Sequence, residues 1–372
     1  MNNSGTFFYR GINKIGGTLM KGFLMFAVMA SSLLLRAHAE DSLWQAYRSQ
    51  YIQNGRVVDG TNGNISHSEG QGYGMLIAGA AGDRESFDSL WNWTRNNLQV
   101  RGRMQLRGDS LFAWRWRPDG NGGGAVDDMN DASDGDILIA WALVRASDRW
   151  QNDSYREAAR QIAQDVRAKL LRPSAFGPLL LPGIKGFEHD STIIVNLSYW
   201  VFPAFRDLAK VDPSPVWRDL EVSGRRLAAA AQFGRWGLPP DWLSVHGQQV
   251  SVASGFDPVF GYNAVRIPLY LAWANETGTN CATALIRFYN DAANNADGPK
   301  ATVNLQTNEL GKDPALQGMR AIYDFISLQD NKSADTLAHP YATLASDESY
   351  FSASLGLLAN MASSERRLYA KP

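Results

Sequence analysis

The segment NDASDGDILIAWALVRASDRW, residues 130–150, combines a dense group of acidic residues with a long apolar repeat. Apolar or small residues recur at three- and four-residue spacing, which predicts a helix over 134–150 with one buried face: Ile137, Ala140, Leu143, Val144 and Ser147. Asp131, Asp134 and Asp136 crowd the start of this helix, where they either complement the helix dipole or project into a site. The D-x-x-D-x-D spacing lacks the twelve-residue loop and closing glutamate of a calcium-binding loop.

The same helical spacing recurs along the chain from residue 40 onward, with little alternating strand pattern. We expect about eleven helices, near 41–52, 70–81, 84–98, 134–150, 154–171, 191–209, 214–233, 262–276, 281–294, 313–328 and 347–361. Long loops at 99–131, 172–190 and 234–261 separate some of them, and loops of this length are usually functional. Because no linker divides residues 40–372, the economical architecture is one all-α domain with helices paired around a centre.

A further acidic residue, Glu69, lies in the unusual stretch SEGQGYGM, residues 68–75. On spacing alone, it is either a first-turn glutamate favoured by the helix dipole or a carboxylate at the mouth of a site. The second alternative is of interest because cleavage of a glycosidic bond needs two carboxyl groups, one to protonate the leaving oxygen and one to activate water. The neighbouring glycines would then let a polymer chain approach the backbone closely.

A third segment, SGFDPVFGYNAVRIPLYLAW at residues 254–273, places four polar or aromatic residues around another helix start: Asp257, Tyr262, Asn263 and Arg266. If Arg266 is buried near a carboxyl group, it will lower the pKa of that group and keep it charged.

Composition excludes several classes of function. The 36 Lys and Arg residues balance 37 Asp and Glu residues, so nothing indicates nucleic acid as a partner. The chain has 12 Trp and 13 Tyr residues, and we expect most of them to pack in the core. Any that form an exposed stacking surface would contact sugar rings rather than bases, because the net charge is close to neutral. The lone Cys281 excludes an internal disulfide and a cysteine-based metal site, and no HExxH pattern occurs among the five histidines. The sequence therefore requires no metal and no cofactor.

The amino terminus is typical of an export signal. Lys21 precedes a short apolar run at 22–35, which is followed by Ala37-His38-Ala39, an A-x-A cleavage motif. We expect cleavage after Ala39, with residues 1–39 forming an N-terminal extension and signal peptide, and export to the periplasm or the exterior. The alternative is an uncleaved anchor helix, although the run is short for a membrane span.

Together, these segments resemble glycoside hydrolase family 8. Residues 132–150 resemble the family signature, SEGQGYGM resembles the stretch with its general acid, and YNAVR at 262–266 is similar to its general-base segment. The order of the segments and the export signal also resemble the bacterial endoglucanases that accompany cellulose synthesis. The resemblance implies an (α/α)6 barrel of six inner and six outer helices with a cleft at one end, and inverting endo-hydrolysis of β-1,4-glucan.

The same resemblance implies roles for individual residues. Glu69 would be the proton donor, with a pKa raised by partial burial or by Asp134 as its neighbour, and Asp134 would contact the distorted sugar. Contacts to substrate would come from further residues: Tyr73, Trp114, Trp116, Asp131, Tyr262, Asn263 and Arg266. The partners would be β-1,4-glucan chains, including cellulose and cello-oligosaccharides, and the cellulose synthase assembly, and we expect a monomer.

Asn263 departs from the family pattern. In many members, the residue directly after the tyrosine is the aspartate that acts as general base. An amide cannot take a proton from water at neutral pH. Three alternatives remain open: Asp257 supplies the base from the same loop, Asp131 or Asp134 holds the water, or the protein mainly binds glucan as a component of the synthase assembly. Xylan, mixed-linkage glucan and chitosan remain alternative substrates.

Overall fold

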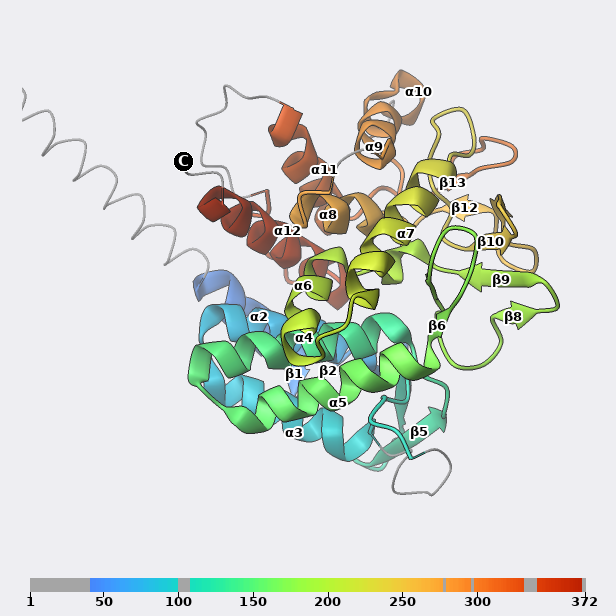
Figure 1. Ribbon diagram of the computed structural model, residues 1–372. Helices are drawn as coiled ribbons and strands as arrows, with labels where there is room; N and C mark the ends of the chain where they lie inside the picture. Colours follow the sequence, from blue (N-terminus) through green and yellow to red (C-terminus); the bar gives the residue numbers. More distant parts are fainter. Residues whose placement is uncertain (1–40, 100–107, 277–278, 296–297, 331–339, 370–372) are drawn as a thin grey trace, which may run out of the picture.

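The computed structural model describes residues 41–99, 108–276, 279–295, 298–330 and 340–369 (Figure 1). Five helices form an inner ring in which each contacts the next: α2 (Ser68–Ala81), α4 (Ser133–Trp150), α6 (Phe202–Val211), α8 (Arg266–Trp273) and α12 (Tyr350–Tyr369). The ring closes where α12, red in Figure 1, packs beside α2, which is blue. The predicted signal peptide and its cleavage site lie outside the described residues.

An outer layer of helices covers the ring: residues 41–51, α3 (Arg84–Asn97), α5 (Asp153–Lys169), α7 (Val216–Ala230), α9 (Cys281–Asn290) and α11 (Gln317–Asp330). Outer helix α3 packs on α2, α5 on α4, α7 on α6, and α9 on α8, so the predicted hairpin pairing and the (α/α)6 barrel are confirmed. In the described part of the chain, only α10 (Ala292–Asn295) and a two-residue strand lie between α9 and α11. One inner position of the barrel is therefore shortened, and α11 packs against α8.

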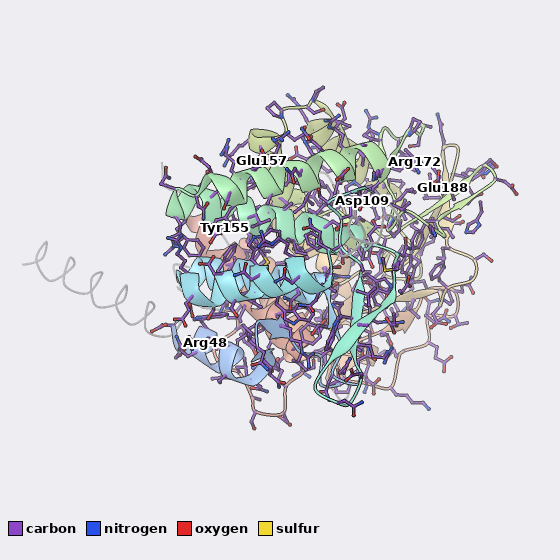
Figure 2. All side chains as sticks on the ribbon, turned by 90° about the horizontal axis from the view of Figure 1, so that it is seen from below. Arg48, Asp109, Tyr155, Glu157, Arg172 and Glu188 are labelled. Carbon is purple, nitrogen blue, oxygen red and sulfur yellow. The ribbon has the colours of Figure 1, made fainter. Side chains whose placement is uncertain are left out.

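The difference between inner and outer helices follows from their sequences. Outer helix α5 buries a single stripe, and Figure 2 shows Tyr155 on this helix facing its neighbours while Glu157 is exposed. Inner helix α4 is buried almost all round from Ser133 to Val144, as a helix between neighbours on every side must be. Asp83 caps α3 by accepting a hydrogen bond from the Ser86 amide.

Glycines allow α2 and α4 to approach closely. A Cβ atom on Gly72 would lie 2.5 Å from the Cβ of Leu138, and one on Gly135 would collide with Ser68. A Cβ on Gly74 would lie 2.7 Å from Val57. The expectation that these glycines of the SEGQGYGM stretch admit a polymer chain is therefore wrong, because neighbouring protein atoms occupy the space.

The predicted helix over 191–209 is wrong in its first half. Thr192–Val195 is strand β9 instead, and the 3-10 turn η1 (Leu197–Tyr199) follows before α6 begins. The β-branched residues of β9 pair with β10 (Leu243–His246) in a four-stranded sheet of order β11-β10-β9-β8, where β8 is Glu188–His189 and β11 is Gln249–Val252. Arg172 and Glu188 form an ion pair on this side of the molecule (Figure 2).

The long loops also contain strands that the sequence did not predict. A three-stranded sheet joins β3 (Ser66–His67), β4 (Arg115–Pro118) and β5 (Gly124–Asp128). Short two-stranded pairs are formed by β1 (Ile52–Gln53) with β2 (Arg56–Val57), β6 (Leu171–Arg172) with β7 (Leu179–Leu180), and β12 (Val259–Phe260) with β13 (Val303–Asn304). Strands β3, β9 and β12 lead directly toward inner helices, so these loops lie at the N-terminal ends of the ring.

The opposite end of the ring, where the inner helices finish, surrounds a pocket of about 970 Å³. Its lining includes Trp141, Arg145, Trp273, Glu365 and Arg366. Of the helices in the described ranges, none has the length and apolar character needed to cross a membrane.

Candidate active site

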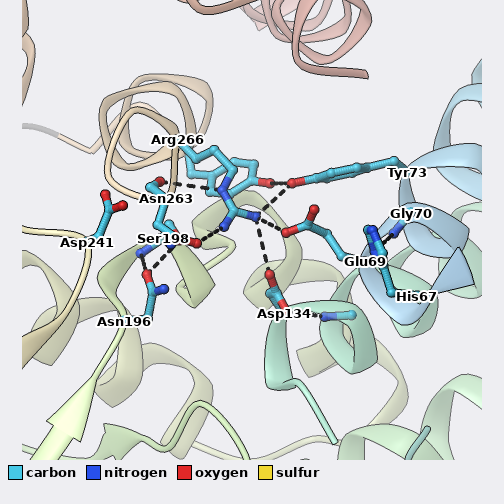
Figure 3. Close-up of polar contacts among 12 residues, drawn as sticks. His67, Glu69, Gly70, Tyr73, Asp134, Asn196, Ser198, Asp241, Asn263 and Arg266 are labelled. Atoms are coloured by element: carbon cyan, nitrogen blue, oxygen red, sulfur yellow. Dashed lines mark hydrogen bonds and ion pairs between the residues drawn. The ribbon is translucent and has the colours of Figure 1, made fainter. Parts of the chain in front are cut away.

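Arg266 is the centre of a buried polar cluster at the N-terminal ends of the inner helices (Figure 3). Its guanidinium group contacts the carboxylate of Glu69, donates to Asp134 Oδ2 at 3.2 Å, and donates to the Tyr73 hydroxyl at 2.9 Å. Its other amino group donates to Asn263 Oδ1 at 2.7 Å. Five residues predicted from three distant segments therefore meet in one place.

The two carboxyl groups meet because each occupies the first turn of an inner helix. Glu69 belongs to α2 and Asp134 to α4, and the helix dipole favours negative charge at both positions. Asp134 Oδ1 also accepts a hydrogen bond from the Gly135 amide at 2.8 Å. The close packing of Gly135 on Ser68 brings the two first turns together.

The cluster separates the pKa values of its two carboxyl groups. Burial, together with the charge of Glu69, raises the pKa of Asp134 well above its ordinary value. Burial also opposes ionisation of Glu69, but the charges of Arg266 and His67 outweigh it and lower the pKa of Glu69. The two shifts have opposite directions, so Asp134 is the harder of the two carboxyl groups to ionise. The expected neighbour of Glu69 is in place, but the raised pKa expected for Glu69 belongs to Asp134, because the Arg266 guanidinium contacts Glu69 directly.

Two of the four aromatic residues expected to contact substrate are buried. Tyr73 is fully buried, and its hydroxyl group lies 3.3 Å from that of Tyr270. Trp116 is 8% exposed and is covered by the Arg56 guanidinium, 4.9 Å from its ring centroid. Stacking of sugars on these rings is therefore not available, because protein atoms already cover them.

Trp114 and Tyr262 remain accessible. Trp114 is half-buried, and its Nε1 donates to Asp128 Oδ2 at 2.8 Å. Tyr262 is 39% exposed, the large aromatic side chain most open to solvent among the described residues, and its ring packs edge-on to Phe351. Tyr262 directly precedes Asn263, which accepts a hydrogen bond from Arg266.

The two other predicted aspartates lie in different surroundings. Asp131 is buried in the loop before α4, and its Oδ1 accepts a hydrogen bond from the Ile184 amide at 3.0 Å, which fixes a neighbouring loop. Asp257 is exposed in the loop before β12. Within the described residues, no hydrogen bond or ion pair joins its carboxylate to the Arg266 cluster.

Asp241 was missed in the sequence as a member of the site. It is 7% exposed, and its Oδ1 accepts hydrogen bonds from the amides of Gly261 and Ala264 at 2.9 and 2.8 Å. Burial raises the pKa of its carboxyl group. Figure 3 places Asp241 beside Asn263, on the side of Arg266 away from Glu69. No spacing in the sequence connects Asp241 to α8, and only the fold of the 234–261 loop does so.

The arrangement suits acid–base chemistry by carboxyl groups. In the part of the chain that the structure describes, no group of three or more His, Cys, Asp or Glu side chains is arranged to hold a metal ion.

The chain is similar to known glycoside hydrolases over most of its length. The sequence profile of Glycosyl hydrolases family 8 matches residues 18–365. The chain is 39% identical over 328 residues to a probable endoglucanase of Novacetimonas hansenii, covering 87% of this chain and 91% of that protein. It is similar to the solved endo-beta-1,4-glucanase CMCax from Acetobacter xylinum, with 36% identity, a TM-score of 0.76, and coverage of 89% and 99% of the two chains. The endoglucanase Cel10 structure from Klebsiella pneumoniae gives 32% identity, a TM-score of 0.76, and coverage of 88% and 100%. The chain therefore belongs to glycosyl hydrolase family 8.

Proposed function

We propose that this glycoside hydrolase is an endo-β-1,4-glucanase that cleaves cellulose chains internally with inversion at the anomeric carbon. The observation that supports this most strongly is the convergence of Glu69 and Asp134 on the buried Arg266. The similar proteins from Novacetimonas hansenii and Acetobacter xylinum, named as endoglucanases, support the same activity and substrate.

In the proposed reaction, Glu69 protonates the glycosidic oxygen of the leaving sugar. In this proposal Asp134, whose carboxyl pKa is raised, passes a proton to Glu69, and Glu69 passes it to the leaving oxygen. Asp134 then becomes negatively charged as positive charge develops on the reacting sugar, and this charge stabilises the oxocarbenium-like transition state. Arg266 holds both carboxyl groups in place throughout.

The water-activating base lies on the Asn263 side of the cluster in this proposal. Asn263 accepts from Arg266 and is not a base, since an amide does not take up a proton at neutral pH. We retain Asp257 as the base because it is exposed and belongs to the loop that leads to α8. Asp241 is the alternative that the structure adds, because it lies beside Asn263 and its carboxyl pKa is raised.

We further propose that the protein is exported to the periplasm or the exterior and acts on cellulose made by its own cell, with the cellulose synthase assembly as a partner. The support is the signal-like sequence of residues 1–39 and the resemblance to endoglucanases that accompany cellulose synthesis.

The test is the viscosity of carboxymethylcellulose over time with the wild-type protein and with Glu69→Gln. An endo-acting enzyme lowers viscosity rapidly, and loss of a general acid reduces the rate by about 10²–10⁴-fold. Glu157→Gln is the matched control, because this glutamate is exposed on outer helix α5 and should not affect turnover. Proton NMR of fresh cellopentaose products should show the inverted anomer first.

Failure of the wild-type protein to lower viscosity would contradict cellulose hydrolysis. Activity on xylan, mixed-linkage glucan or chitosan would then identify another substrate. Binding of cello-oligosaccharides without turnover would instead identify a glucan-binding protein, as the replacement of the usual base by Asn263 would allow.

A further inference from the structure

The helix turn that presents Glu69 is capped by a histidine. His67 is the N-cap residue of α2, with the extended backbone angles of such a position, and its Nδ1 accepts a hydrogen bond from the Gly70 amide at 3.2 Å (Figure 3). Glu69 lies between the two ends of this bond. The cap therefore closes the turn around the proposed general acid.

This cap constrains the protonation of the imidazole ring. A nitrogen that accepts a hydrogen bond from an amide must have its lone pair free, so Nδ1 is unprotonated and the neutral ring has its hydrogen on Nε2. Nε2 then donates to the Tyr350 hydroxyl, 2.8 Å away at the start of α12. In contrast, the usual N-cap residues Ser, Thr, Asp and Asn accept through oxygen, and none gains a positive charge between pH 5 and 8.

The groups that face the ring come from several elements. Asp59, from the loop after β2, lies 3.9 Å from Nε2, and Glu69 interacts with the ring through its charge. Tyr350 packs edge-on to the ring, with 5.3 Å between centroids. On the paired strand β4, Arg115 is turned to an ion pair with Asp127. Two carboxylates, one phenol ring and one backbone amide therefore face the His67 ring.

Gly70 lies next to the same two rings. A Cβ atom at this position would lie 3.4 Å from Tyr350 and 3.5 Å from His67, which are ordinary van der Waals distances. The rings of His67 and Tyr350 therefore both border the backbone of the turn.

We propose that His67 is a positioning residue that couples the Glu69 turn to pH: the neutral ring caps the turn, and protonation at Nδ1 releases the cap. The inference rests on the proposed role of Glu69 as general acid. Protonation places an N–H at Nδ1 against the N–H of Gly70, so the bond is lost and the imidazolium moves toward Asp59. Glu69 then loses its fixed position relative to the leaving oxygen, and activity falls on the acid side.

The test compares kcat and kcat/KM on cellopentaose, a neutral substrate, between pH 4 and 8 for the wild type and His67→Asn. The asparagine amide oxygen still caps the turn, so the variant should keep activity within about threefold of wild type at pH 8. At pH 5 it should exceed the wild type severalfold, because the asparagine cap has no ring nitrogen that can take up a proton. His246→Asn is the matched control, since His246 lies exposed on β10 and bonds to Ser191, and it should leave the profile unchanged.

An acid limb in His67→Asn identical to that of the wild type would overturn the proposal and leave His67 as a simple cap. If His67→Asn does not fold, ¹⁵N NMR of the wild type decides instead. Nδ1 must be the unprotonated nitrogen at high pH, and the Gly70 amide resonance must move with the His67 titration; a Gly70 resonance that does not move contradicts the coupling.

The same NMR titration in Glu69→Gln separates the two proposals. Full activity in that variant would refute Glu69 as the acid, whatever His67 does. Loss of activity with the Gly70 titration retained would support both.

Discussion

Both ends of the inner ring place an arginine next to a carboxylate, but Arg266 is buried whereas Arg145 is partly exposed. At the N-terminal end, Arg266 faces two carboxyl groups, Glu69 and Asp134. At the C-terminal end, the ion pair of Arg145 within the described residues is with one carboxylate, Glu365, and the other oxygen of Glu365 accepts from Trp273 Nε1 at 2.8 Å.

The C-terminal end satisfies its own charges. Lys210 and Trp141 bond to the two oxygens of Asp207, at 2.6 and 2.7 Å, and Arg366 donates to the Ala272 carbonyl at 3.0 Å. Cations at helix C-termini complement the dipole there. The N-terminal end instead crowds like charges where the dipole favours them, and this crowding together with burial raises the carboxyl pKa of Asp134. Because α4 rises about 1.5 Å per residue, its last turn lies roughly 20 Å from Asp134. The N-terminal end therefore has the groups that the proposed proton transfer needs, whereas the charges at the other end are neutralised by ion pairs and hydrogen bonds.

The largest expected effect is that of Asp134→Asn, which should reduce kcat on cellopentaose by about 10³-fold by removing the proton source and the developing charge. The same variant should be more stable at pH 7. Folding raises the pKa of the Asp134 carboxyl group above its value in the unfolded chain, which is near 4. The contribution of this group to stability is fully present below the unfolded pKa and is lost as pH rises through the folded pKa. Thermal unfolding from pH 4 to 7 measures this, and the difference in midpoint between the variant and the wild type should grow with pH. A midpoint below that of the wild type at pH 7 would contradict a raised carboxyl pKa for Asp134.

The base variants come next. Asp257→Asn should lower kcat by about 10²-fold, with recovery in sodium azide because azide replaces the activated water. Asp241→Asn should mainly lower the unfolding midpoint, because it weakens the anchor of the turn at 261–264 that precedes α8. Azide recovery in Asp241→Asn and not in Asp257→Asn would assign the base to Asp241.

A smaller effect is expected from Arg266→Lys. A lysine keeps the charge but cannot contact Glu69, Asp134 and Asn263 together, since it lacks the planar fork of the guanidinium. We expect kcat to fall by about tenfold. The pKa of Glu69 should rise toward its ordinary value, which moves the corresponding limb of the pH profile of kcat/KM to higher pH. An unchanged limb would show that Arg266 does not control this pKa.

The smallest effect should come from Glu365→Gln at the opposite end. Loss of the charge on a partly exposed pair should lower the free energy of unfolding by about 1 kcal/mol, measured by urea denaturation. Activity on cellopentaose should not change. A tenfold loss of activity would break the comparison, because it would show that the two ends are coupled.

The family, the helical fold and the five residues of the Arg266 cluster were accessible from the sequence. The apolar repeat of residues 134–150 determines a buried helix wherever it packs, and acids at helix starts are visible as a pattern. The strands inside the loops could not be predicted from the sequence. Pairs such as Leu243 with Val195 depend on a partner almost fifty residues away and not on neighbouring sequence. For the same reason the first half of the 191–209 segment was predicted as helix.

By itself, the sequence determined which residues have the chemistry for a glycosidase: the carboxyl groups of Glu69 and Asp134, the charge of Arg266, and the amide of Asn263 where a base is usual. Only the tertiary structure decided that burial raises the carboxyl pKa of Asp134, that Tyr73 and Trp116 are covered, and that Asp241 and His67 lie beside the Arg266 cluster. The physical reason is that pKa values and accessibility depend on burial and on charges within a few ångströms. Those neighbours come from segments far apart in the chain, such as Arg266 beside Glu69.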